Sequence, residues 1–237
     1  RIAAGATVIQ VDAAPPPVAR LADAGCASTG AIEISDGRQR LIVNCGGAGL
    51  EGAWITADLA QGLRTTAAHS TLVLNDSNST ALLPGGTLGK GVTEVELNRQ
   101  EMDNGSRLEL SHDGYVRRMG YVHRRLLMVS GDGREVRGED MLTPAERRRK
   151  PGRQPVQVRF HLAPGVEPTL TADNQAAVLR IDQGALWQFR TGAGLLSVED
   201  SLWVDGGGHP HPTRQLVVTG EALPGGSSIG WLFKRMG

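Results

Sequence analysis

The feature that most constrains the fold is the recurrence of turn residues, every ten positions or so, between short segments rich in β-forming residues. Residues 31–35 alternate apolar and polar side chains, Asp36-Gly37 follows, and residues 40–43 form an apolar return segment. Alternation with a period of two suits a strand with one buried face, and Asp-Gly is a preferred hairpin turn. The sequence therefore predicts an all-β fold, a large antiparallel β-sandwich of stacked sheets with short helical turns only.

The remaining segments continue this pattern without a detectable repeat or a linker, so a single domain over residues 1–237 is expected. A short helix is expected within residues 54–63, and residues 143–155 read as an exposed loop with about one helical turn. The basic run at 147–150 in that loop is either a solvated surface or a patch for an acidic ligand. Strands are expected at 6–12, 71–74, 93–97, 107–111, 115–119, 121–129, 135–140, 156–160, 178–181, 187–190, 202–204, 215–219 and 230–234.

Composition excludes several classes of function. Lys plus Arg and Asp plus Glu both number 25, so the net charge is zero and no global field favours nucleic acid or a membrane surface. No apolar run approaches the roughly 20 residues that a membrane-spanning helix needs. Cys26 and Cys45 permit at most one disulfide, which does not define the compartment. Because the chain starts at Arg1 without Met or an apolar signal region, we expect it to begin partway through a longer product.

The candidate chemistry centres on residues 64–74, where a polar turn carries His69 into an apolar strand. A histidine held at a strand mouth by a sheet is well placed for chemistry, although a hydrogen-bonded structural histidine has the same pattern. The turn at His112, Asp113 and Tyr115 groups a base, a carboxylate and a phenol, and it also reads as a plain Asp-Gly turn. Standard zinc, phosphate-loop and nucleophile-elbow motifs are absent from the sequence.

Five segments together resemble the C-terminal β-sheet domain of the heparinase II/III-like family, in an order and spacing that cover nearly the whole chain. No single segment is specific, but the set is hard to match otherwise. The segments are Ala-Ile-Glu-Ile-Ser-Asp-Gly at 31–37 leading to Leu-Ile-Val-Asn-Cys-Gly at 41–46, Arg-Thr-Thr-Ala-Ala-His-Ser-Thr at 64–71, His-Asp-Gly-Tyr at 112–115 with His-Arg-Arg at 123–125, Gly-Glu-Asp at 138–140, and Arg-Phe-His-Leu at 159–162.

The resemblance implies the C-terminal domain of a polysaccharide lyase that cleaves acidic, uronate-containing glycans such as heparan sulfate or alginate. It further implies an N-terminal α/α toroid domain of the same protein as a partner, a substrate cleft between the two domains, and a periplasmic or secreted location. The toroid usually supplies the tyrosine acid/base. The isolated β domain is therefore expected to be inactive.

The resemblance also implies a zinc site, which this sequence matches only in part. His69 corresponds to a zinc-binding histidine of some members, and Asn44 falls where those members have an aspartate. The His-x-His pair that should precede the first hairpin is missing, because residues 24–29 read Ala-Gly-Cys-Ala-Ser-Thr. A neutral amide is a weak zinc ligand, so zinc at Asn44 and His69 would need help from Cys26 or Cys45.

Lyases of this class break a 4-linked uronide by β-elimination. The enzyme stabilises the enolate-like intermediate and supplies a base for the proton at C5. We expect His69 to neutralise the substrate carboxylate or to assist proton transfer, with Tyr115 and His112 as further catalytic candidates. Arg64 is the candidate clamp for the substrate carboxylate. The alternative is a non-catalytic β-sandwich for packing or glycan binding, and a hydrolase is a third possibility that no carboxylate pair in the sequence supports.

Overall fold

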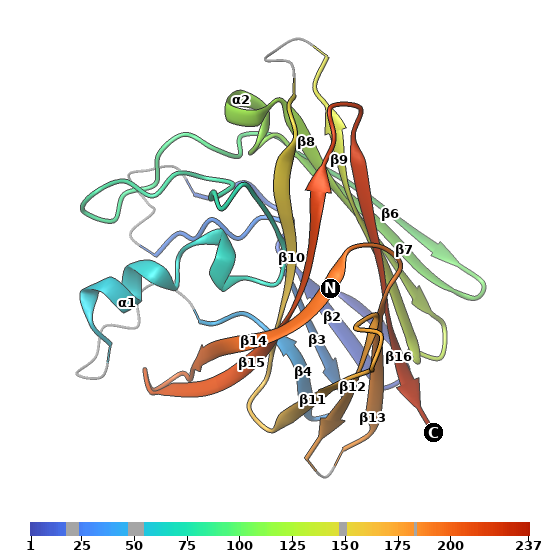
Figure 1. Ribbon diagram of the computed structural model, residues 1–237. Helices are drawn as coiled ribbons and strands as arrows, with labels where there is room; N and C mark the ends of the chain where they lie inside the picture. Colours follow the sequence, from blue (N-terminus) through green and yellow to red (C-terminus); the bar gives the residue numbers. More distant parts are fainter. Residues whose placement is uncertain (18–23, 47–54, 147–150, 183) are drawn as a thin grey trace.

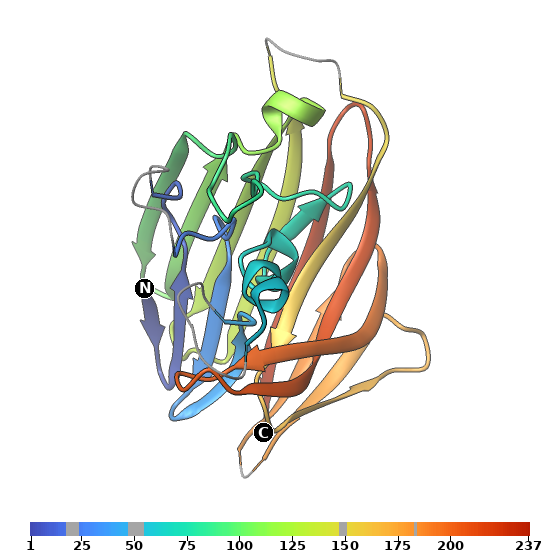
Figure 2. The same ribbon diagram turned by 90° about the vertical axis from the view of Figure 1, so that its left-hand side faces the viewer.

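The computed structural model describes residues 1–17, 24–46, 55–146, 151–182 and 184–237, which form two eight-stranded antiparallel sheets packed face to face (Figures 1 and 2). The predicted all-β sandwich is confirmed. The first sheet has the order β1-β2-β3-β4-β10-β15-β14, with β5 also paired to β10. Its strands are β1 (Ile2–Ala4), β2 (Thr7–Val11), β3 (Ile32–Asp36), β4 (Gln39–Val43), β5 (Leu72–Leu74), β10 (Gln154–Leu162), β14 (Leu195–Val204) and β15 (Pro210–Ala222).

The second sheet has the order β11-β12-β13-β16-β9-β8-β7-β6, so the last strand of the chain lies in its middle. Long hairpins build most of this sheet, and each pairs neighbours in sequence except where β16 joins β13 to β9. Its strands are β6 (Val95–Met102), β7 (Gly105–His112), β8 (Tyr121–Ser130), β9 (Glu135–Pro144), β11 (Val166–Leu170), β12 (Ala176–Ile181), β13 (Leu186–Thr191) and β16 (Ser227–Met236).

The first hairpin follows its prediction. Strands β3 and β4 pair antiparallel, and Gly37 in the turn has a φ of 58°, a conformation that glycine adopts without steric cost. Ile34 faces Ile42 across the pair, and both side chains are buried in the sandwich. The period-two pattern of the sequence therefore selected the correct inner face.

Two parts of the prediction differ from the structure. Residues 115–119 were expected as a strand but contain the helical turn α2 (Val116–Met119), which ends at Gly120 with a left-handed φ of 81°. The turn lets the Tyr115 side chain point into the core, whereas an extended segment would alternate its side chains between the two faces. Strands β1 and β11 were not expected at all. The basic run at 147–150 lies outside the described residues.

The helix expected near residues 54–63 is present as α1 (Ala57–Gly62), although Trp54 lies outside the described residues. The side chain of Thr56 caps its first turn by accepting from the amide of Leu59. In Figure 1, α1 and the 3-10 helix η2 (Thr66–Ala68) lie beyond the first sheet, on the side away from the second sheet, and Figure 2 shows them in front. No helix among the described residues is long and apolar enough to cross a bilayer.

An aromatic cluster fills the centre of the sandwich and determines one glycine position. Phe160 of the first sheet contacts Trp231 and Phe233 of the second, with ring centroids 4.8 Å and 5.2 Å apart. The indole of Trp231 lies directly over Gly138 on the neighbouring strand β9, and a Cβ built on Gly138 would be 2.1 Å from that ring. The glycine of the Gly-Glu-Asp segment at 138–140 is thus explained by packing, because only a residue without a side chain leaves room for the indole.

We predict that Gly138→Ala lowers the free energy of unfolding by about 1–3 kcal/mol, since the methyl group must displace the packed ring of Trp231. Urea denaturation measures the change. Gly230→Ala on β16 is the matched control, because a Cβ there would meet no atom within 4 Å. Equal effects of the two substitutions would contradict this packing argument.

Candidate functional site

A fully buried ion pair joins strands β8 and β9 inside the sandwich. The guanidinium of Arg125 donates to both oxygens of Asp140, at 2.8 Å from Nε and 2.9 Å from Nη2, and both side chains have no exposed surface. His123 and Trp231 donate to the same carboxylate, each at 2.8 Å. Burial alone would raise the pKa of Asp140, but Arg125 and the hydrogen bond from His123 outweigh it and hold the pKa well below its usual range.

The remaining nitrogen of Arg125 reaches across to the loops of the first sheet. Its Nη1 donates to the backbone carbonyls of Gly30 and Ser70, at 2.8 Å each. Ser70 is itself a junction, because its hydroxyl donates to the carbonyl of Val43 and accepts from the amide of His161. The buried ion pair therefore fixes the backbone at Gly30 and at Ser70, directly after His69, relative to the second sheet.

His112 extends the buried network. The amide of Gly114 donates to its Nδ1 at 3.2 Å, so that nitrogen carries no proton and Nε2 donates to Nδ1 of His123 at 3.0 Å. Burial first, and the neighbouring His123 second, hold the pKa of His112 well below its ordinary value. Both rings are thus neutral, and every hydrogen bond points inward toward Asp140. This direction suits a structural network more than a proton path to solvent.

His69 follows η2 and occupies the turn that the sequence indicated. Its Nδ1 lies 2.7 Å from the carbonyl of Thr65, which can only accept, so Nδ1 carries the proton and Nε2 is left as a base. The side chain is only 4% exposed, and Nε2 has no partner among the described residues. Burial lowers the pKa of His69, while the Thr65 carbonyl and the charge of Asp12 act in the opposite direction.

His69 borders a hollow of about 420 Å³, here called the His69 hollow. This volume lies within the range of small-molecule sites in proteins. Its wall combines polar side chains from β2, β3 and the following loops with one aromatic side chain from β14. The described residues that line it are Gln10, Val11, Asp12, Cys26, Ser28, Ala31, Glu33, Asn44, Gly46, His69 and Trp203.

Asn44 lies in the same hollow as His69, but its amide is occupied. The oxygen accepts from the amide of Ser70 at 2.8 Å, and the nitrogen donates to Glu33 at 3.0 Å. Among the described residues, no group of three or more His, Cys, Asp or Glu side chains is arranged to hold a metal ion. The residues present therefore do not fit the zinc site that the family resemblance implies.

Neither cysteine supplies the missing ligand in this arrangement. Cys26 borders the His69 hollow, whereas Cys45 is buried beside His161, with 3.3 Å between its sulfur and Nδ1. Burial raises the pKa of the Cys45 thiol, so it is not an activated thiolate. His161 donates from Nε2 to the carbonyl of Ala67, and burial lowers its pKa to about 3. Cys45 and His161 therefore form a structural contact beneath the turn that carries His69.

Tyr115 and Arg64 are both buried, away from the His69 hollow. The hydroxyl of Tyr115 donates to the carbonyl of Leu72 at 2.9 Å, and burial raises the pKa of this phenol. Arg64 is 6% exposed, and its guanidinium donates to the carbonyls of Gly25 and Gly86, which joins two loops. The catalytic and clamping roles stay predictions, and the observed contacts favour structural roles for both side chains.

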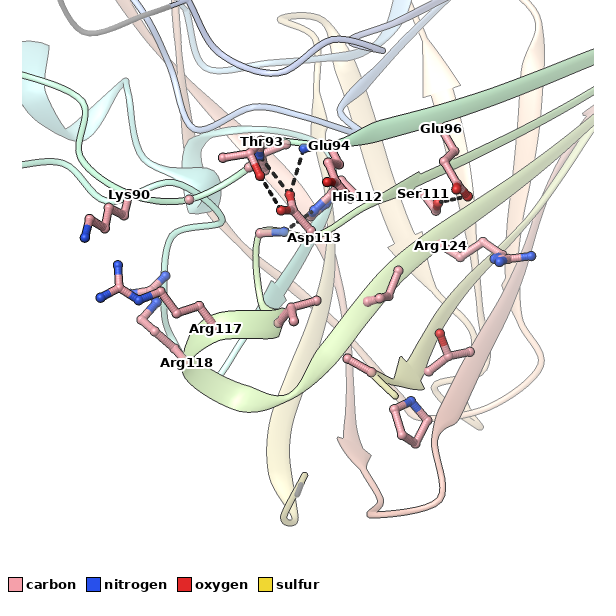
Figure 3. A pocket seen from close by; sticks show the side chains of 18 of the residues that line it. Lys90, Thr93, Glu94, Glu96, Ser111, His112, Asp113, Arg117, Arg118 and Arg124 are labelled. Atoms are coloured by element: carbon pink, nitrogen blue, oxygen red, sulfur yellow. Dashed lines mark hydrogen bonds between the residues drawn. The ribbon is translucent and has the colours of Figure 1, made fainter. Parts of the chain in front are cut away.

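His112 borders a second, larger hollow of about 1480 Å³, shown in Figure 3. Lys90, Arg117 and Arg118 lie together at one side of it, near α2. Asp113 is turned toward the start of β6, where it accepts from the amide and hydroxyl of Thr93 and from the amide of Glu94. The four predicted catalytic and binding residues therefore do not converge, because His69 and His112 border different hollows and the other two line neither.

The sequence did not single out three residues of the His69 hollow. Glu33 is visible only as a polar position in an alternating strand, and Asp12 only as the last residue of the strand expected at 6–12, one position beyond the end of β2. Trp203 reaches the hollow because β14 and β15 form a long hairpin, on which its indole contacts His211 and lies under Arg40. The combination of one indole and several polar groups in one hollow is thus apparent only from the fold.

We predict that Asp140→Asn destabilises the fold by about 3–5 kcal/mol, because it leaves the buried charge of Arg125 uncompensated. Asp36→Asn is the matched control. Asp36 likewise accepts from a tryptophan, Trp187, and an arginine, Arg235, but the Arg235 side chain is 34% exposed. Urea unfolding compares the two, and a larger loss for Asp36→Asn would argue against the central place of Asp140.

Lowering the pH from 7 to 5 is predicted to reduce the free energy of unfolding. His161 has a folded pKa of about 3 against about 6.5 unfolded, so only the unfolded state takes up a proton, and stability present above pH 6.5 is lost toward pH 3. The loss from His161 alone is about 2 kcal/mol between pH 7 and 5. His161→Gln should shrink the difference, and an unchanged difference in this variant would contradict the assignment to His161.

Comparison with known proteins gives one family and several similar structures. The model of the family described as heparinase II/III-like, C-terminal, matches residues 1–232. FtsZ-localized protein C of Caulobacter vibrioides is 31% identical over 241 residues, which cover 96% of this chain and 40% of that protein. The chain therefore spans less than half the length of this curated relative.

Two solved structures share the fold at low sequence identity. The heparan sulfate lyase HepC from Pedobacter heparinus superposes with a TM-score of 0.76 at 15% identity, covering 97% of this chain and 33% of the lyase. A heparinase III superposes with a TM-score of 0.66 at 12% identity, covering 89% of this chain and 30% of its own. With the family match over nearly all residues, these findings mean that the chain belongs to the heparinase II/III-like family and corresponds to its C-terminal domain.

Proposed function

We propose that this chain is the β-sandwich part of a polysaccharide lyase that cleaves acidic, uronate-containing glycans by β-elimination. The observation that carries the proposal is the state of His69. Its Nδ1 proton is held by the Thr65 carbonyl, and its Nε2 has no partner among the described residues at the wall of a ligand-sized hollow. Family membership supports the same reaction class.

In this proposal His69 assists proton transfer. Elimination removes the proton at C5 of the uronide, forms the C4–C5 double bond and releases the oxygen at C4 with its electron pair. A neutral imidazole can accept the C5 proton at Nε2 and then pass that proton to the leaving oxygen, and the lowered pKa of His69 keeps the ring neutral at pH 7. Neutralising the substrate carboxylate does not suit an uncharged ring, so that task falls to other groups.

Those groups belong to an N-terminal toroid domain of the same protein, which we propose as the partner across the cleft. Such a partner would also supply the tyrosine acid/base, because Tyr115 is buried against Leu72. An exported location, periplasmic or secreted, goes with a polysaccharide substrate. No step of the proposal uses zinc, since the donor set around Asn44 and His69 does not fit it.

A non-catalytic role is the second candidate, and two observations favour it. The carboxylates of Asp12 and Glu33 share the hollow with His69, which makes it inhospitable to an anionic transition state. The relative at 31% identity is named for its localisation with FtsZ and not for an activity on glycans. In this case the sandwich would serve packing or glycan binding within a larger protein.

The two candidates are separated by turnover of the full-length protein on a panel of uronate-containing polysaccharides, followed by absorbance of the unsaturated product. The lyase proposal predicts turnover that falls at least about 100-fold in His69→Gln, the usual contribution of a proton-transfer group. His209→Gln controls for loss of an exposed histidine. EDTA treatment should leave the activity unchanged. Metal analysis of the same sample should find no stoichiometric zinc. Turnover unaffected by His69→Gln would remove His69 from the mechanism, and no turnover on any substrate would favour the non-catalytic role.

A further inference from the structure

We infer that the His69 hollow binds an uncharged sugar residue, packed against Trp203 and hydrogen-bonded by Asp12 and Glu33. The inference rests on the proposed function only in taking the ligand to be a glycan. It goes further by assigning the charge of the sugar ring that this domain contacts. For an acidic glycan, this places the uncharged residue inside the hollow and the neighbouring uronate at its mouth, with its carboxylate away from Asp12 and Glu33 and its C5 toward His69.

Two independent observations mark the hollow as a ligand site. It has the volume of a small-molecule pocket, about 420 Å³. It is also bordered by a buried polar side chain with an open position, because His69 is 4% exposed and its Nε2 has no hydrogen-bond partner among the described residues. A ring nitrogen of this kind gains a hydrogen bond when a ligand hydroxyl donates to it.

The charge of the wall selects against a uronate. Asp12 and Glu33 are the ionisable carboxylates of the hollow, and the described residues that line it include no Lys or Arg. Ser28 donates to Asp12 and Asn44 donates to Glu33, but neither donor carries a charge. A sugar carboxylate in the hollow would therefore meet two like charges without a compensating cation.

Trp203, the aromatic residue of the hollow, is held by two neighbours outside it. The guanidinium of Arg40 lies over the indole of Trp203, 5.2 Å from the ring centroid, and His211 contacts the same indole at 5.6 Å. These neighbours orient the indole, part of which borders the hollow. Apolar ring surface beside hydroxyl-binding groups suits the mixed surface of an uncharged sugar.

The carboxylates are free to accept sugar hydroxyls. One oxygen of each is engaged, Oδ2 of Asp12 by Ser28 at 2.6 Å and Oε1 of Glu33 by Asn44 at 3.0 Å. The other oxygen of each has no partner among the described residues. A charged acceptor makes a stronger hydrogen bond to a hydroxyl than a neutral one does. The arrangement thus offers two fixed acceptors, a basic ring nitrogen at His69 and an apolar surface to one sugar ring.

Isothermal titration of this chain with two hexasaccharides tests the inference, one of polygalacturonate and one whose carboxylates have been reduced to hydroxymethyl groups. The reduced form is expected to bind at least about tenfold more tightly, because it lacks the repelled charge. Trp203→Ala should weaken its binding about fivefold. Asp12→Asn with Glu33→Gln keeps both acceptors and should strengthen polygalacturonate binding about fivefold.

Asp76→Asn with Asp103→Asn, which removes two exposed carboxylates outside the hollow, is the matched control and should change neither affinity. Circular dichroism confirms that each variant is folded. Tighter binding of polygalacturonate, or no binding of either hexasaccharide at millimolar concentration, would overturn the inference. Because binding is measured without turnover, either result leaves the lyase proposal to its own test.

Discussion

The buried pair of Arg125 and Asp140 is the interaction on which the arrangement of the site depends. A charge in a protein interior is tolerated only when it is paired and hydrogen-bonded. Here the carboxylate of Asp140 accepts four hydrogen bonds. The pair also fixes positions outside its own sheet, because one guanidinium nitrogen donates to the carbonyls of Gly30 and Ser70 in loops of the first sheet. Hydrophobic packing alone would hold the sheets together without fixing those two turns.

The role of this buried pair explains why sequence motifs with catalytic residue types lie mostly in the protein interior. His112, His123 and Asp140 come from two of the five segments that carry the family resemblance, and the structure joins them in one buried network. Gly138 is explained by the indole above it. The resemblance therefore identified the fold correctly, because these segments build the fold.

The alternating pattern of residues 31–43 was sufficient to predict the first hairpin and its buried face, since strand periodicity is local. The site was less accessible to sequence reasoning. Tyr115 and Arg64 have the residue types of catalytic groups, but burial and backbone partners are decided by contacts with Leu72 and Gly86, which lie far along the chain or in another loop. Trp203 could not be associated with His69 before the β14–β15 hairpin was placed at the edge of the first sheet.

The two hydrogen bonds of the Asn44 amide restrict which substitutions the His69 hollow can accept. Position 44 must both accept from Ser70 and donate to Glu33, and of the two isosteres only asparagine does both. An aspartate there would place a second negative charge against Glu33 with no proton between them. A change toward a metal-binding hollow would thus require simultaneous replacement of position 33, so the two residues are bound to vary as a unit.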